Sequence, residues 1–197
     1  MVPMSSNPPE HCVLLSETDR VFLLQLARKS IAYGLEHAKL LPVSNYDYPE
    51  SLHVPRATFV TLHRHDQLRG CIGSLEARRS LVEDVAYNAH AAAFHDPRFT
   101  PLTRAELDDL SIHISILQPA ERLRFHSEHE LLTQLRPGID GLILQEGVHR
   151  ATFLPSVWES LTEPQAFLNH LKQKAGLRMD YWSDKMQAWR YTTESFP

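Results

Sequence analysis

The sequence has few of the features that mark secreted or membrane proteins. It holds only two cysteines, Cys12 and Cys71, in 197 residues, too few for the disulfide framework of a small secreted domain. No apolar run approaches the ~20 residues that a membrane-spanning helix needs. The first ten residues also lack the basic and then apolar pattern of a secretion signal. We therefore expect a cytoplasmic protein that does not enter a membrane.

Dense positive charge and metal-binding spacings are missing as well. The net charge is −4, and Arg78-Arg79 is merely a pair of the kind usual in a solvated turn. Nucleic-acid binding depends on neutralising phosphates with clustered Lys and Arg, so we expect no nucleic-acid partner. The 12 histidines include no HExxH pair, and the cysteines form no CxxC pair. The sequence predicts no metal site and no bound cofactor.

The bulk composition is that of an ordinary folded domain. Hydrophobic residues make up 43% and charged residues 22% of the chain, which is typical of globular proteins. At ~150 residues per domain, this length favours a single domain, with or without two lobes. We expect residues 1–15 to form a flexible leader and residues 16–197 to form one domain.

Local patterns predict an α+β fold with a largely antiparallel sheet, flanking helices and two lobes. Helical spacing predicts a helix at 17–36, capped by Ser16. A capping box of Ser80 and Glu83 begins another, which ends near Phe94. Strict alternation at 111–116 predicts a half-buried strand. Other strands are expected at 57–63, 68–72, 142–145, 149–153 and 186–191, and shorter helices after Thr103, at 131–135 and between 158 and 171. Each half has a glycine-bracketed strand followed by helices, which hints at internal duplication.

The sequence predicts the functional centre at the segment Leu68-Arg69-Gly70-Cys71-Ile72-Gly73. With the residues after it, LRGCIGSLEA, it resembles the hallmark of the AMMECR-type family, known in bacteria as AmmeMemoRadiSam system protein A. Further blocks that match the family are EDV (83–85), AAF (92–94), DPRF (96–99), RPGIDGLIL (136–144), RATFLP (150–155), VWE (157–159) and KAGL (174–177). The resemblance spans roughly residues 17–195.

The resemblance implies a single α+β domain with two lobes and a cleft. It also implies an association with a Memo-like protein of the extradiol-dioxygenase fold and with a radical SAM protein, without assigning a reaction to this component. One position departs from the family. His113 stands where the family strand usually has Glu, which weakens any transfer of an acid role to that position.

Cys71 and Arg69 are the candidate catalytic residues. Alternation along a strand would place both on one face, and a nearby cation favours the reactive thiolate. Three interpretations stay open: Cys71 is a nucleophile, it lines a ligand pocket, or it is a small thiol that fills core space. No general base is identified from the sequence, which therefore does not decide whether the protein is an enzyme.

The candidate ligand-binding residues are Gly70, Gly73, Arg98 and His113. The two glycines either cradle an anion or mark a bend in the strand. Arg98 either lies near the cleft or pairs with Asp96 to hold a loop. Our first hypothesis is an accessory or interaction protein of the AmmeMemoRadiSam system, with a cleft beside Leu68–Gly73 for an unknown small-molecule ligand or a partner. The alternative is an enzyme that uses Cys71 as nucleophile.

Overall fold

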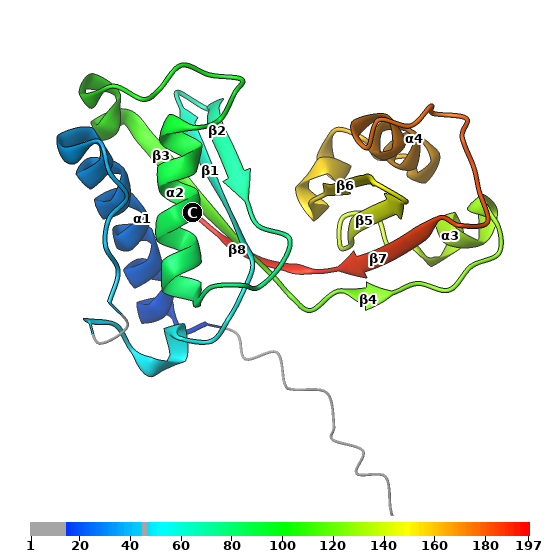
Figure 1. Cartoon of the computed structure of the whole chain (residues 1–197), viewed down its shortest axis with the longest axis horizontal. Coiled ribbons are helices and arrows are strands. Elements are labelled where there is room, and N and C mark those ends of the chain that lie inside the picture. Colours follow the sequence, from blue (N-terminus) through cyan, green and yellow to red (C-terminus); the bar gives the residue numbers. More distant parts are fainter. Residues whose placement is uncertain (1–14, 45–46) are drawn as a thin grey trace, which may run out of the picture.

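The computed structural model describes residues 15–44 and 47–197 and has two lobes (Figure 1). The expected flexible leader, residues 1–15, lies almost entirely outside the described residues. Each lobe has one four-stranded antiparallel sheet with helices packed against it, so the predicted α+β class is confirmed. In the described part of the chain, no helix is long and apolar enough to cross a membrane.

The first lobe is built around the sheet β2-β1-β3-β8. Its elements are α1 (Glu17–His37), a 3-10 turn η2 (Glu50–Leu52), β1 (Thr58–Arg64), β2 (Gln67–Gly73), α2 (Leu81–Phe94), a 3-10 helix η3 (Arg104–Asp109), β3 (Leu110–Leu117) and β8 (Thr193–Phe196). Helices α1 and α2 cover one face of this sheet (Figure 1). Ile112, Ile114 and Ile116 of β3 point into the core between this sheet and the two helices, as their alternation predicts. The capping box of Ser80 and Glu83 begins α2 as expected.

The second lobe is built around the sheet β4-β7-β5-β6. Its elements are β4 (Glu121–Arg122), α3 (Glu128–Gln134), β5 (Gly141–Glu146), β6 (His149–Phe153), a 3-10 helix η4 (Pro155–Glu159), α4 (Pro164–Lys174) and β7 (Gln187–Tyr191). The buried Phe167 of α4 stacks on Trp158, with ring centroids 3.8 Å apart. This lobe therefore has its own apolar core, separate from the core beneath α1 and α2.

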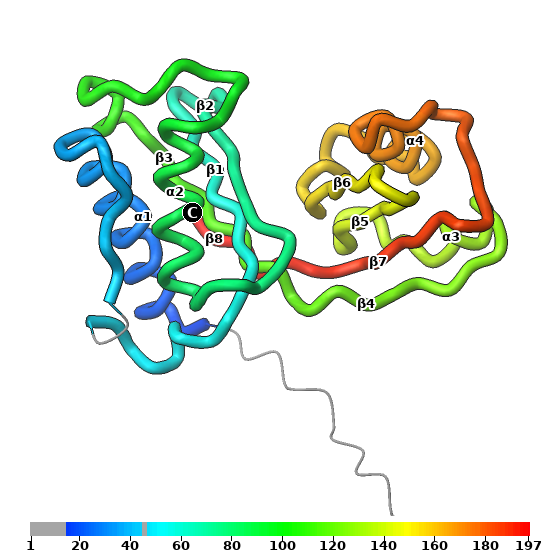
Figure 2. The backbone as a smooth tube through the Cα atoms, in the orientation of Figure 1, coloured from blue at the N-terminus to red at the C-terminus, as the bar shows by residue number. Residues whose placement is uncertain are grey.

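The chain passes between the lobes twice, in opposite directions. It leaves the first lobe from β3 into β4 and returns from β7 into β8 (Figure 2). The two passages lie side by side where the Gln118 N–H donates to the Thr192 carbonyl at 2.9 Å. The sequence predicted a last strand at 186–191 and missed β8, which returns to the first sheet and pairs with β3.

The two lobes repeat one order of elements. A hairpin, a helix and a third strand occur as β1-β2-α2-β3 and again as β5-β6-α4-β7. In both lobes the first strand of the hairpin lies between its partner and the third strand. The hint of duplication in the sequence thus has a counterpart in the strand pairing.

Candidate functional site between the lobes

The motif segment 68–73 lies within β2, at one edge of the first sheet. A tight turn joins β1 to β2, with His65 and Asp66 at φ of 49° and 60°, the conformation that two-residue hairpins favour. In the register of the sheet, Cys71 lies opposite Thr61, and Thr61 lies opposite His113. The three side chains therefore form a row on one face, and the Thr61 hydroxyl donates to Cys71 Sγ at 3.3 Å.

Arg69 does not follow the expected uninterrupted alternation. The pairing of β2 with β1 shifts at this residue, which is the extra residue of a β-bulge. Its Nε donates to Glu106 Oε1 at 2.8 Å and its Nη2 to the Thr100 carbonyl at 3.0 Å. Within the described residues, no hydrogen bond or ion pair joins Arg69 to Cys71.

Both glycines of the motif lie where a side chain has no room. A Cβ on Gly70 would come within 2.2 Å of the Ala92 carbonyl oxygen on α2, and one on Gly73 within 2.2 Å of Cγ of Phe59. Close approach of α2 and of an aromatic ring accounts for glycine at these positions.

The Asp96–Arg98 loop runs along the free edge of β2. The backbone N–H of Cys71 donates to Asp96 Oδ2 at 2.8 Å, and Arg98 Nη2 donates to the Cys71 carbonyl at 3.3 Å. Arg98 also pairs with Asp96 at 2.7 Å. These hydrogen bonds, chiefly those from Arg98, hold the pKa of the buried Asp96 carboxyl well below its usual range. The loop thus fixes the backbone at Cys71 and places a guanidinium beside it.

Lys174, in the last turn of α4, brings a second cation from the other lobe. Its Nζ donates to the Thr152 carbonyl at 3.0 Å and lies 5.2 Å from the centre of the Phe153 ring. Partial burial of the ammonium group lowers the pKa of Lys174, and the positive charge of Arg98 lowers it further, against an opposing effect of Cys71 in its thiolate form. The sequence predicted Cys71 and Arg98 at the site. For Lys174, in the KAGL block, it left open whether the side chain lies near the cleft or has a purely structural role.

His113 lies on the same sheet face as Cys71, two strands away. Two strand spacings put the backbones about 10 Å apart, with Thr61 between them. The His113 ring lies edge-on to His63 at 5.3 Å, and partial burial, together with His63, lowers the pKa of His113. No group of three or more metal-ligating side chains occurs among the residues that the structure describes.

A cavity of about 500 Å³ begins at the carboxyl end of the motif. Ile72 and Gly73 line it from the first lobe and Arg150 of β6 lines it from the second. Arg150 Nη1 pairs with Glu76 Oε1 at 3.2 Å and so joins the lobes across it. We call the region between Cys71, Arg98 and Glu76 on one lobe and Arg150 and Lys174 on the other the interlobe seam. A larger cavity of about 700 Å³ lies elsewhere, beside Trp158 and Ser195, and includes no residue of the motif.

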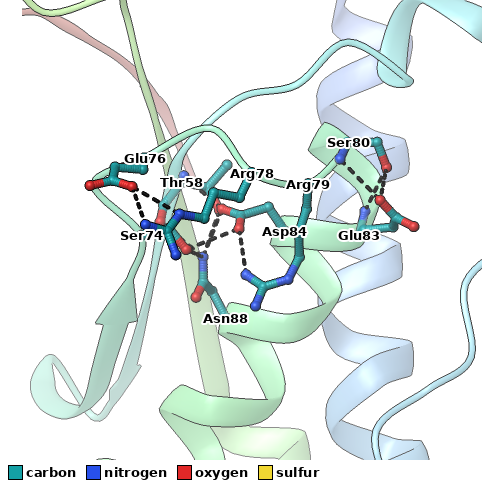
Figure 3. A network of polar contacts seen from close by, with 9 residues as sticks. All are labelled: Thr58, Ser74, Glu76, Arg78, Arg79, Ser80, Glu83, Asp84 and Asn88. Carbon is teal, nitrogen blue, oxygen red and sulfur yellow. Dashed lines mark hydrogen bonds and ion pairs between the residues drawn. The ribbon is translucent and has the colours of Figure 1, made fainter.

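A buried polar network supports the wall of the 500 Å³ cavity (Figure 3). The fully buried Asp84 carboxylate accepts hydrogen bonds from Thr58, Ser74 and Asn88. Arg79, expected in a solvated turn, instead donates to the same carboxylate at 3.1 Å. The network ties the loop after the motif to α2 and β1, which gives that side of the cavity a fixed shape.

Known proteins are similar to this chain in sequence and in overall structure. A family model described as AMMECR1 matches residues 24–196. Protein MJ0810 of Methanocaldococcus jannaschii is 35% identical over 187 residues, covering 93% of this chain and 92% of that protein. A Saccharolobus islandicus protein is 38% identical over 169 residues, which cover 83% of this chain and 74% of that protein. The chain belongs to the AMMECR1 family, which confirms the resemblance seen in the sequence.

A solved structure supports the same conclusion. The crystal structure of an uncharacterized protein, PH0010 from Pyrococcus horikoshii, is similar with a TM-score of 0.82 and 32% identity, over 88% of each chain. This similarity supports both the fold and the family membership of the chain. It assigns no reaction, because that protein is itself described as uncharacterized.

Proposed function

We propose that this protein is an accessory or interaction component of the AmmeMemoRadiSam system that binds a ligand or partner in the interlobe seam beside Leu68–Gly73. The observation that carries the proposal is the Arg98 guanidinium beside Cys71, where Arg98 Nη2 donates to the Cys71 carbonyl at 3.3 Å. Arg150 and Lys174 of the second lobe border the same seam. The adjoining cavity begins at the next two residues of the motif. Paired cations beside a concave surface form a binding site for an acidic group.

The proposed partners are the Memo-like protein and the radical SAM protein of that system. Family membership supports this association. The exposed charged side chains of the seam would form ion pairs with the partner. Arg98 keeps 54% of its side chain exposed although it pairs with Asp96. A guanidinium held in one orientation loses little entropy when it binds a carboxylate.

Co-purification of the full chain with each partner tests the proposal. Lys174→Gln removes one of the two second-lobe cations at the seam and leaves Arg150. Lys185→Gln is the matched control because Lys185 is exposed and its side chain has no ion pair among the described residues. We expect association with at least one partner, weakened about tenfold by Lys174→Gln and unchanged by Lys185→Gln. Consistent failure to associate, with both partners folded, would rule out the complex.

A second candidate function, an enzyme with Cys71 as nucleophile, has one specific observation in its favour. The Thr61 hydroxyl donates a hydrogen bond to the sulfur, and such donors, like the nearby cations, stabilise a thiolate. Among the described residues, Thr61 is the one side chain hydrogen-bonded to the sulfur. No side chain in the described part of the chain is hydrogen-bonded there that could act as a general base.

Alkylation by iodoacetamide separates the two candidates when it is measured in a Cys12→Ser background, where Cys71 is the single thiol. A nucleophilic Cys71 is expected to react faster in the folded chain than in urea at pH 7, and Thr61→Val and Lys174→Gln are expected to slow it. A thiol that is inert when folded, or full partner binding and function in Cys71→Ser, would reject the enzyme.

A further inference from the structure

The 500 Å³ cavity beside the motif has three arginines in its wall: Arg78, Arg79 and Arg150. We propose that this cavity binds the phosphate group of a small phosphorylated ligand, and that the Glu76 carboxylate takes the place of that phosphate when the ligand is absent. The inference rests on the proposed function, since it gives the chemical class of the ligand bound in the seam.

The charges around the cavity favour an anion. Three guanidinium groups face two carboxylates, Glu76 and Asp84, which leaves one positive charge unbalanced. Asp84 is fully buried, and its carboxylate accepts hydrogen bonds from Thr58, Ser74 and Asn88 as well as from Arg79. It is therefore a fixed part of the wall, and Glu76 is the carboxylate that can move.

Glu76 already occupies the position that an anion would take. Its carboxylate accepts hydrogen bonds from Arg78 of its own loop and from Arg150 of the other lobe, and these bonds lower the pKa of Glu76. The Glu76 side chain is 47% exposed, and exposed ion pairs contribute little stability. A phosphate dianion has twice the charge of a carboxylate and three acceptor oxygens, so it can contact several guanidinium groups at once and displace Glu76.

Arg79 is held in position for such a ligand. Its guanidinium lies 3.9 Å from the centre of the Tyr87 ring, and its Nη1 donates to Asp84. These two contacts fix the plane of the group, while its Nε and Nη2 have no partner within residues 15–44 and 47–197. The donors are therefore oriented before a ligand arrives, which reduces the entropy lost on binding.

A buried acceptor in the same wall adds selectivity. Asn88 donates through Nδ2 to acceptor atoms of Thr58, Ser74 and Asp84, which fixes the orientation of its amide. Its Oδ1 is left buried without a partner in the described structure. Inorganic phosphate carries at least one proton near pH 7 and can donate it to this oxygen, as can the singly protonated form of a phosphate monoester, whereas sulfate has none to donate. The cavity should therefore prefer phosphate to sulfate.

The test is calorimetric titration of the full chain with inorganic phosphate, sulfate and acetate at pH 7 and constant ionic strength. We expect saturable one-to-one binding of phosphate, at least fivefold weaker binding of sulfate and no saturable binding of acetate. Arg150→Gln should weaken phosphate binding at least tenfold, and Glu76→Gln should strengthen it at least threefold because the competing carboxylate is gone.

Arg178→Gln is the matched control, because Arg178 is exposed and pairs with Asp180 in the same lobe much as Arg150 pairs with Glu76. Arg78→Gln repeats the test on an exposed side chain of the first lobe, should Arg150→Gln disturb folding. Absence of saturable phosphate binding, equal affinity for sulfate, or equal effects of Arg150→Gln and Arg178→Gln would overturn the inference. Partner association without phosphate binding would overturn this inference alone, whereas phosphate binding without partner association would overturn the proposed complex.

Discussion

Replacing Gly70 by alanine is expected to lower the free energy of unfolding by about 3 kcal/mol. The added Cβ would lie 2.2 Å from the Ala92 carbonyl oxygen and 3.1 Å from its carbonyl carbon, roughly 1 Å too close for ordinary contact. Overpacking a core costs ~1–3 kcal/mol. The upper end applies because the obstacle is the backbone of a buried helix, which cannot turn aside as a side chain can.

Urea unfolding of the wild type, Gly70→Ala and Gly138→Ala checks this value. A loss of about 3 kcal/mol corresponds to a melting temperature roughly 6–12 °C lower in a chain of this size. At Gly138 a Cβ meets nothing within 4 Å, and φ is +77°, so alanine there should cost about 1–2 kcal/mol from backbone strain alone. A Gly70→Ala protein within 1 kcal/mol of wild type would refute the packing argument and return Gly70 to the ligand-binding role considered from the sequence.

Three further outcomes follow from the structure. The pKa of Glu106 is lowered to about 2, chiefly by its hydrogen bond with Arg69. A lowered carboxyl pKa stabilises the fold above pH ~4.5, and this stabilisation is lost as the pH falls through the folded-state pKa. In urea titrations at several pH values, Glu106→Gln should therefore lower the free energy of unfolding by about 2 kcal/mol at pH 7 and by almost nothing near pH 2. Phe167→Ala removes a fully buried ring stacked on Trp158 and should cost ~3–5 kcal/mol, with a change in tryptophan fluorescence. Ser80→Ala breaks a capping box and should cost ~1 kcal/mol in the same unfolding assay; a loss above 3 kcal/mol would show a larger role for that hydroxyl.

Most of the elements were predictable because their signals are local. The first helix, expected at 17–36, runs over Glu17–His37, and the helix after Ser80 ends at Phe94 as expected. The isoleucines of β3 alternate with polar residues, so both the strand and its buried face follow from the sequence. Caps and alternation depend on neighbours a few residues apart, and tertiary contacts reinforce them here.

The missing elements and contacts depend on distant residues. Strand β4 has two residues, and β8 exists because it pairs with β3, far away in the chain. The bulge at Arg69 follows from pairing with β1, which a strand read alone does not reveal. Arg150 and Lys174 come to the seam from the second lobe, and no local pattern links either position to residue 71. The fold class and two seam residues, Cys71 and Arg98, were therefore accessible from the sequence, while the place of Arg150 and Lys174 was left open.

The return of the chain into β8 sets an order for assembly during synthesis. The buried Glu194 of this strand accepts hydrogen bonds from the backbone of Leu15 and from Arg20, so the first sheet and α1 are completed by residues that leave the ribosome after the whole second lobe. Until then, the edge of β3 that pairs with β8 is open. A stop codon just before β8 would thus spare every element of the second lobe and damage the first, the lobe that carries Cys71.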